Sequence, residues 1–317
     1  MDSDQWTALV IDHSLLATHH LLLAALMPEQ LFQFLVTGVT VGSIYALVGL
    51  GFALIYNASD VVNFAQGEFV MLGAMTAIAL LGAGLPLPLA AVAATLLTVL
   101  IGLLLERFAI EPAFGASVVT TIIITIGAAI LVRGIALLLW GKDFHALPPF
   151  SGDAPLHLGS ATLLPQSLWV LGGAIVLVTL VHAFLNHTLL GKALLACSFN
   201  RAAAQLVGIN VRVMLRLAYG LSAGLGALAG ILIAPITFSS YEAGVMLGLK
   251  GFSAAIVGGI GNPMGAVAGG LLLGVLEALG AGLISSGYKD AIAFLFVLMV
   301  LFFEPTGLFG HKVAERV

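Results

Sequence analysis

Residues 118–140 read VVTTIIITIGAAILVRGIALLLW, a stretch whose one charged residue is Arg133. An α-helix needs about 20 predominantly apolar residues to cross the hydrocarbon core of a bilayer, so this stretch is long enough to span a membrane. The whole sequence has the same character, because 61% of its residues are hydrophobic and 8% are charged. A soluble domain carries about 25% charged residues. The composition therefore predicts an all-α polytopic membrane protein.

Nine apolar stretches of this kind are expected to form helices. They lie near residues 31–56, 66–83, 88–107, 118–140, 167–185, 213–235, 246–260, 263–283 and 290–304. The seventh is short for a crossing, and Gly261-Asn262-Pro263 follows it, which is typical of a half-helix or a re-entrant element. We therefore expect about eight to nine transmembrane helices, half-helices included.

The distribution of Lys and Arg predicts how the chain lies in the membrane. Residues 1–106 contain neither, whereas residues 187–217 contain four of the eleven cations and no Asp or Glu. Because loops rich in Lys and Arg stay on the cytoplasmic side, nine crossings place the N-terminus outside and the C-terminus in the cytoplasm. We expect an extracytoplasmic segment at 1–30, a transmembrane domain at 31–312 that includes the cytoplasmic loop, and a cytoplasmic tail at 313–317.

Within this basic loop, residues 198–208 read SFNRAAAQLVG. Asn200 is a favourable N-cap residue and Gly208 a favourable residue just beyond a helix C-terminus, so the pattern predicts about two turns of helix. Small alanines on its surface would let this helix lie in a groove of another protein. The other interpretation is an ordinary interfacial helix between two membrane spans.

A polar cluster of Asn63, Gln66 and Glu68 stands at the start of the second apolar stretch. Placing an acidic residue at the bilayer centre costs about 2.5–3.5 kcal/mol on insertion scales, so such residues usually face a cavity or a partner. Gly67 permits a break in helical geometry. These three residues are candidates to line or gate a pathway, together with Tyr45. Alternatively they cap the start of a helix, with Glu68 in its first turn.

Two further charged residues lie inside apolar stretches, Arg133 in the fourth and Glu277 in the eighth. Each would be costly alone, whereas an ion pair across two helices would be tolerated. We therefore predict that Arg133 contacts Glu277. The alternative is that Arg133 extends its head group to the membrane surface.

Motifs of catalytic sites are absent from the sequence. It contains no Gly-x-x-x-x-Gly-Lys-Ser/Thr phosphate-binding loop, no Gly-x-Ser-x-Gly and no His-Glu-x-x-His. The glycines at 224, 226 and 230 lie inside an apolar stretch with one residue too many for a dinucleotide site, so helix packing is the better interpretation. Cys197 is the one cysteine, which excludes a disulfide within the chain. We expect no enzyme activity, cofactor or metal site, so any ATP would be hydrolysed by another chain.

Four stretches carry distinctive motifs, namely 62–68 (VNFAQGE), 202–208 (AAAQLVG), 258–266 (GGIGNPMGA) and 304–310 (EPTGLFG). In this order they resemble motifs of the branched-chain amino acid permeases of ABC importers, the LivH-type family, and the resemblance covers residues 31–312. The second is similar to the Glu-Ala-Ala-x-x-x-Gly loop of importer permeases in general. Two positions depart from the family pattern: Ala202 stands in place of the acidic residue of that loop, and Gln66 in place of a histidine.

The resemblance implies a function and a set of partners. Such a permease resides in the bacterial inner membrane and pairs with a second, related permease. Two cytoplasmic ATPase subunits and a periplasmic substrate-binding protein complete the importer, and no nucleic acid is involved. The residues implied to couple to the ATPase are Asn200, Arg201, Ala202, Ala203 and Gly208. The implied substrate is a branched-chain amino acid, with urea, short amides and other small polar solutes as alternatives.

Two other classes of function fit the same apolar helices. A stand-alone secondary transporter or channel would also use half-helices and charged groups near the membrane midplane, and transport without ATP would distinguish it. A structural membrane subunit has no pathway. In that case, mutating the polar cluster at 63–68 would leave uptake unchanged.

Overall fold

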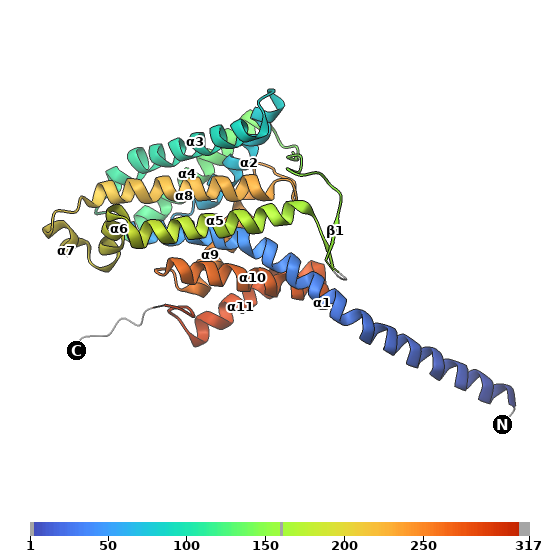
Figure 1. The fold of residues 1–317 in the computed structure, drawn as a ribbon. Coiled ribbons are helices and arrows are strands. Elements are labelled where there is room, and N and C mark those ends of the chain that lie inside the picture. Colours follow the sequence, from blue (N-terminus) through green and yellow to red (C-terminus); the bar gives the residue numbers. More distant parts are fainter. Residues whose placement is uncertain (1–2, 159–160, 311–317) are drawn as a thin grey trace.

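The computed structural model describes residues 3–158 and 161–310, and it consists almost entirely of helices. The long helices lie roughly side by side, with α6 and α7 at one end of the molecule and the hairpin of β1 and β2 at the other (Figure 1). The first half contains α1 (Ser3–Ser59), α2 (Gln66–Gly82), α3 (Leu87–Leu105), the π-helical turn η1 (Glu106–Ile110), the 3-10 turn η2 (Glu111–Ala113) and α4 (Val118–Trp140). The antiparallel strands are β1 (Leu156–Leu158) and β2 (Ala161–Leu163). The second half contains α5 (Pro165–His187), α6 (Leu189–Phe199), α7 (Arg201–Leu206), α8 (Val211–Ile233), α9 (Ala243–Gly258), α10 (Pro263–Leu283), the 3-10 turn η3 (Ser286–Tyr288) and α11 (Lys289–Phe303).

Each of the nine predicted apolar stretches contains a helix. In the described part of the chain, seven helices are long and apolar enough to cross a membrane. The other two are α2, with 17 residues, and α9, with 16. The all-α polytopic class is therefore confirmed, and the seventh stretch is a short helix, as expected. α2 is a second short helix, which its apolar sequence did not distinguish from a full crossing.

The N-terminal segment is continuous with the first membrane helix. We predict a boundary at residue 30, but α1 runs through it without a break, from Ser3 to Ser59. Figure 1 shows the first half of this helix projecting away from the other helices. The cytoplasmic tail predicted at 313–317 lies outside the described residues.

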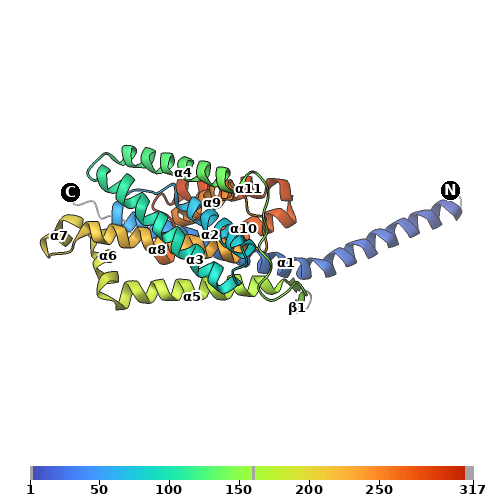
Figure 2. The same ribbon diagram turned by 90° about the horizontal axis from the view of Figure 1, so that it is seen from above.

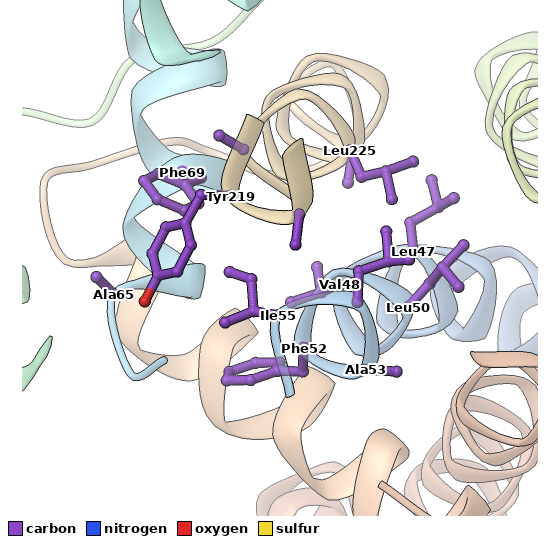
Figure 3. Close-up of a cluster of buried hydrophobic side chains, with 14 of the residues drawn as sticks. Leu47, Val48, Leu50, Phe52, Ala53, Ile55, Ala65, Phe69, Tyr219 and Leu225 are labelled. Carbon is purple, nitrogen blue, oxygen red and sulfur yellow. The ribbon is translucent and has the colours of Figure 1, made fainter. Parts of the chain in front are cut away.

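The second half of α1 is the central helix of the core. An 18-residue window of α1 between residues 30 and 59 is 89% buried, whereas the corresponding window of α4 is 17% buried. Figure 3 shows Ile55 of α1 directed toward Tyr219 of α8 and Phe69 of α2, and Leu47 of α1 directed toward Leu225 of α8. Seen from above, α4 and α5 lie at opposite edges of the molecule with α2 and α8 between them (Figure 2). The apolar outer faces of α4 and α5 are thus free to contact lipid or another subunit.

α2 and α9 cross at their first turns with almost no side chain between them. A Cβ atom added to Gly67 would lie 2.0 Å from the carbonyl oxygen of Gly244 and 2.8 Å from the Cα atom of Gly248. Small residues allow helix backbones to approach this closely in membranes, where van der Waals packing drives helix association. The contact fixes the starts of both short helices at one point inside the molecule.

From this crossing, the two short helices run toward opposite ends of the molecule. α2 lies parallel to α8, since Gln66 is beside Ser222 and Val70 is beside Gly230. α9 lies parallel to the second half of α1 in the same way, since Lys250 is beside Tyr45 and Ala254 is beside Gly49. α1 and α8 themselves run in opposite directions (Figure 1). α2 and α9 are therefore oppositely directed half-helices with their N-termini together.

The opposite directions of α2 and α9 belong to a larger inverted repeat. It relates two three-helix units that contain matching short sequences. Matching tripeptides and a tetrapeptide recur 175 residues apart, as from Gly49 to Gly224. They are Gly-Leu-Gly at 49–51 and 224–226, Val-Met-Leu-Gly at 70–73 and 245–248, and Ala-Val-Ala at 91–93 and 266–268. These segments lie in α1, α2 and α3 and, in the same order, in α8, α9 and α10. The two units meet at the α2–α9 crossing.

The crossing makes a prediction about stability. Gly67→Ala should lower the thermal unfolding midpoint of the purified protein, because its methyl group would meet backbone atoms that cannot move independently. Overpacking of this kind typically costs about 1–3 kcal/mol. The matched control is Gly172→Ala in α5, where an added Cβ meets no atom within 4 Å. Equal unfolding midpoints for the two variants in detergent would contradict the close crossing.

Candidate functional site

The segment between α1 and α2 forms a tight turn around Asn63. Its side-chain oxygen accepts a hydrogen bond from the backbone N–H of Ala65 at 3.1 Å, and its backbone carbonyl accepts one from Gln66 at 3.1 Å. The side-chain nitrogen of Asn63 is buried without a hydrogen-bond partner among the described residues. Asn63 thus shapes the entry into α2, and Glu68 stands in the first turn as predicted.

Gln66 joins the start of α2 to α1 and α8. Its Nε2 donates to the backbone carbonyl of Ser222 at 3.2 Å, and its Oε1 accepts from the Ser222 hydroxyl at 2.5 Å. That hydroxyl is also 2.9 Å from the carbonyl oxygen of Gly51 in α1. Both ends of the Gln66 amide are therefore bonded inside the helix bundle. Its role in a pathway stays a prediction.

A cavity of about 280 Å³ lies beside the α2–α9 crossing. One wall carries Glu68 from α2 and Arg133 from α4, whose Nη2 is 2.5 Å from Glu68 Oε1. Glu68 is 1% exposed, and a buried carboxylate is stable only with such a partner. Another wall is aromatic and includes Phe52 and Phe252. The cavity therefore combines an ion pair with an apolar surface.

The predicted pair of Arg133 and Glu277 is wrong. Arg133 bonds to Glu68, whereas Glu277 bonds to Lys250 of α9, with Nζ 2.7 Å from Oε1. The reason is the position of the helices: α4 lies against α2, while the Glu277 face of α10 packs on α1 and α9. A third charge inside an apolar stretch, Lys250, was the signal in the sequence that pointed to this alternative pairing.

Lys250 is the centre of a second buried charge cluster. Its Nζ is 2.7 Å from Asp290 Oδ1 of α11 and 3.1 Å from the Tyr45 hydroxyl, and that hydroxyl donates to Glu277 Oε2 at 2.9 Å. The cluster ties α1, α9, α10 and α11 together. Tyr45 therefore lies in this cluster and not on the wall of the 280 Å³ cavity.

The short helix predicted in the basic loop is α7, and both of its predicted end residues are confirmed. The Asn200 side chain accepts a hydrogen bond from the backbone N–H of Ala203 at 2.9 Å. Gly208 has φ +89°, and its N–H donates to the carbonyl of Gln205, while the next N–H, of Ile209, donates to the carbonyl of Ala204. These two bonds form a Schellman motif, which ends a helix sharply.

α7 has an exposed surface at the end of the molecule. Ala202 and Ala203 are exposed, as are large apolar side chains on both sides of them, Phe199 and Leu206, at 84% and 89%. Exposed apolar residues of this size mark an interaction surface when they cluster. Figure 1 shows α7 at the tip of the molecule, where a partner can reach it.

A direct contact connects α7 with the segment that leads into α2. Arg201 Nη2 is 2.8 Å from Asp60 Oδ2, and Asp60 precedes Asn63 by three residues. Asp60 has φ +51°, an uncommon conformation for a residue other than glycine. A cavity of about 460 Å³ lies between this segment, η2 and α7. Movement of α7 would therefore be transmitted through this ion pair to the turn that contains Asn63 and leads to Gln66 and Glu68.

Two acidic residues neutralise part of the basic loop. Arg216 Nη2 is 2.7 Å from Glu111 Oε2, and Arg216 Nε is 3.3 Å from Glu106 Oε2. Glu111 also bonds to Arg107 and lies 3.9 Å from Arg212. The turns η1 and η2 thus place carboxylates against the start of α8. Of the other two cations of the loop, Lys192 lies in α6, and Arg201 begins α7 and pairs with Asp60.

Residues 34–303 match the family described as branched-chain amino acid transport system / permease component. The match includes both half-helices, their crossing and the two buried charge clusters.

The chain belongs to this family of permeases. It is 34% identical over 310 residues to the high-affinity branched-chain amino acid transport system permease protein BraD of Pseudomonas aeruginosa, covering 92% of this chain and 100% of that protein. It is 32% identical over 311 residues to the corresponding permease protein LivH of Escherichia coli K12, with the same coverage. It is also 31% identical over 277 residues to the autoinducer 2 import system permease protein LsrC of Shigella flexneri, covering 82% of this chain and 76% of that protein.

In this permease, two of the motifs that carry the family resemblance contact each other. The N–H of Leu308 donates to the carbonyl of Val257 at 2.8 Å, and the Asn262 side chain donates to the carbonyl of Phe309 at 3.0 Å. The C-terminal motif therefore covers the turn between α9 and α10. It fixes the end of the half-helix that begins at the crossing.

The Lys250 cluster makes a second prediction. Lys250→Met should strongly destabilise the protein, by about 3–5 kcal/mol, because Glu277 would be left as an unpaired buried charge. Lys250→Met combined with Glu277→Leu should recover most of this loss, since Asp290 has a partly exposed side chain that water can solvate. Thermal unfolding in detergent measures both variants. A double variant less stable than the single one would contradict this pairing.

Proposed function

We propose that this chain is a membrane-spanning permease subunit of an ATP-driven importer for a branched-chain amino acid or a related small polar solute, such as urea or a short amide. The observation that carries the proposal is the family match over residues 34–303, together with relatives named as branched-chain amino acid permeases that align over 92% of the chain. Because one relative is named for autoinducer 2 import, other small polar solutes are also candidate substrates. The sequence has no phosphate-binding loop, so ATP hydrolysis belongs to separate subunits.

The proposed assembly contains this permease, a second related permease, two cytoplasmic ATPase subunits and a periplasmic substrate-binding protein. It resides in the bacterial inner membrane, with the N-terminus outside and the C-terminus in the cytoplasm. The cations of the 187–217 loop support this orientation. They support a cytoplasmic position for α6 and α7, in which the exposed surface of α7 would be available to an ATPase.

The proposed mechanism transmits ATPase closure through α7. When the ATPase subunits close, they displace α7, and α6 and α8 follow because they flank it in the chain. The pair of Arg201 and Asp60 passes the same displacement to the turn at Asn63. The turn and the start of α2 then shift relative to α4, and the cavity beside the crossing changes the side to which it opens. Moving a two-state gate from 1:99 to 99:1 requires about 5.5 kcal/mol of differential binding, and ATP binding can supply it.

A stand-alone secondary transporter is the second candidate. The inverted repeat of α1–α3 and α8–α10 favours it, because many secondary transporters have this architecture. Family membership favours the importer. Uptake into vesicles distinguishes them: the importer requires ATP and the binding protein, whereas a secondary transporter requires neither.

The coupling proposal makes a third prediction. Arg201→Glu should uncouple ATP hydrolysis from uptake at normal protein levels, because it repels Asp60 and the displacement is no longer transmitted. Gly208→Asp should have the same effect, because a side chain at φ +89° strains the end of α7. Uptake and ATPase activity are measured together in proteoliposomes of the assembled importer.

The charge-swapped variant Asp60→Arg with Arg201→Glu is the control for this experiment. It restores an ion pair of opposite direction, so it should recover part of the uptake lost in Arg201→Glu. Normal coupled uptake in both Arg201→Glu and Gly208→Asp would refute the coupling role of α7.

A further inference from the structure

We propose that the groove between α3, α5 and α8 binds an anionic phospholipid, whose acyl chains lie along α8 and whose phosphate lies at Arg216. The groove has a volume of about 710 Å³. The lipid belongs to the cytoplasmic leaflet, a statement that rests on the orientation given under the proposed function. The inference otherwise goes beyond that function, because it concerns the outside of the helix bundle and not the transported solute.

The groove is apolar along its length and charged at one end. Leu103 of α3 and Phe184 of α5 are on its two walls, and α8 forms the floor. Arg216 is the one polar or charged side chain among the described residues that line it. The floor is kept low by Gly220, where an added Cβ would meet only side-chain atoms of the α3 wall, the nearest at 3.5 Å from Leu103. A phospholipid has the same profile, with a charged head and an apolar body.

The dimensions of the groove favour hydrocarbon chains over a helix of another subunit. From Arg216 to Leu228 the groove follows α8 for about 18 Å, at a rise of about 1.5 Å per residue. Its volume over this length corresponds to a mean cross-section of about 40 Å². A helix with its side chains is about 10–12 Å across and needs at least twice this cross-section. The groove is therefore too narrow to seat a helix, whereas extended acyl chains fit it.

The charged end of the groove carries a net positive charge. Three arginines meet two carboxylates there, namely Arg107, Arg212 and Arg216 with Glu106 and Glu111. Within the described part of the chain, the carboxylates accept two hydrogen bonds from these guanidiniums, both at Glu111 Oε2. Each guanidinium has five N–H donors in a planar fork that matches a phosphate. One positive charge and most of the donors thus remain for a phosphodiester, as in the basic pockets that bind anionic head groups between membrane helices.

Arg216 lies at a depth from which it can reach the lipid phosphates. It is about 8 Å from the start of α8, a helix of 23 residues that is about 35 Å long. When α8 is centred in a hydrocarbon core about 30 Å thick, the Cα atom of Arg216 is about 5 Å inside the edge of that core. A long basic side chain at this depth extends its head group toward the interface. Its bonds to Glu111, in the turn η2 after α3, point the same way.

Brominated lipids quench the fluorescence of a nearby tryptophan, so they report which lipid occupies the groove. Leu180→Trp places a tryptophan on the α5 wall, at a position that is 60% exposed. Ile123→Trp in α4 is the matched control, at a position that is 63% exposed and outside the groove. The two positions lie about 11 and 8 Å from the cytoplasmic ends of their helices.

The assembled importer is reconstituted in phosphatidylcholine vesicles that contain either brominated phosphatidylglycerol or brominated phosphatidylcholine. Quenching of the unsubstituted importer, which has the natural tryptophans, is subtracted. At Leu180→Trp, phosphatidylglycerol should bind about fivefold more tightly than phosphatidylcholine, the ratio that corresponds to the attraction of one basic residue for an anionic lipid. At Ile123→Trp, the two lipids should quench equally.

Three variants in the Leu180→Trp protein test the head-group and acyl-chain positions separately. Arg107→Gln with Arg212→Gln changes two exposed side chains and leaves the pairs of Arg216 intact, so it should fold and lose the preference for phosphatidylglycerol. Arg107→Lys with Arg212→Lys keeps the charge and should keep most of the preference. Gly220→Phe fills the floor of the groove and should reduce quenching by both lipids.

The outcomes separate this inference from the proposed function. Equal quenching by the two lipids at Leu180→Trp overturns the anionic site, and so does a preference that survives Arg107→Gln with Arg212→Gln. Quenching by neither lipid shows that a protein subunit covers the groove, which also overturns the inference. Quenching is measured without ATP or solute, so an importer that lacks ATP-driven uptake contradicts the proposed function alone.

Discussion

The backbone contact between Gly67 and Gly244 fixes the starts of α2 and α9, and the other helices pack around this point. A helix that starts inside a bundle leaves backbone N–H groups without helical partners, and the membrane interior offers no water to satisfy them. The turns that lead into α2 and α9 satisfy part of these groups. Before α2, Asn63 accepts hydrogen bonds from the N–H groups of Ala65 and Gln66. Before α9, the N–H of Ala243 donates to the carbonyl of Ser240. Two half-helices can thus replace one full crossing.

The two buried charge clusters that surround this crossing differ in how completely they are satisfied. Lys250 has three oxygen partners within 3.1 Å, and it links α9 to α1, α10 and α11. A cluster of this kind holds helices in place, since moving any of them would expose an unpaired charge to the membrane. Glu68 and Arg133 have one hydrogen bond between them and α4 has few other contacts with α2. α4 is therefore the wall that can move, while α9 is held.

Local features of this fold follow from the sequence, and long-range pairings do not. The nine apolar stretches and the two ends of α7 were predictable because length, hydropathy and capping residues act over a few neighbours. Arg133 and Glu277 were paired incorrectly because the choice among partners depends on which helix faces which. The close glycine contacts of α1 with α10 and of α2 with α9 determine which helices face each other, and therefore which charged residues can pair. The shortness of α2 was hidden for the same reason: its apolar residues face protein and not lipid.

The link between α7 and the crossing cannot depend on one ion pair. Asp60 has a side chain that is 63% exposed, and an exposed pair contributes about 0–1 kcal/mol, well below the roughly 5.5 kcal/mol needed to reverse a gate. The larger part of the free energy that couples α7 to the crossing must come from side-chain packing. The described contacts connect α7 to the core in this way. Leu194 and Cys197 of α6 and Ala204 of α7 are buried in the same core cluster as α1 and the start of α8. Packed cores shift as units because their interiors are close-packed. The ion pair then directs this displacement to the turn before α2, and packing supplies its energy.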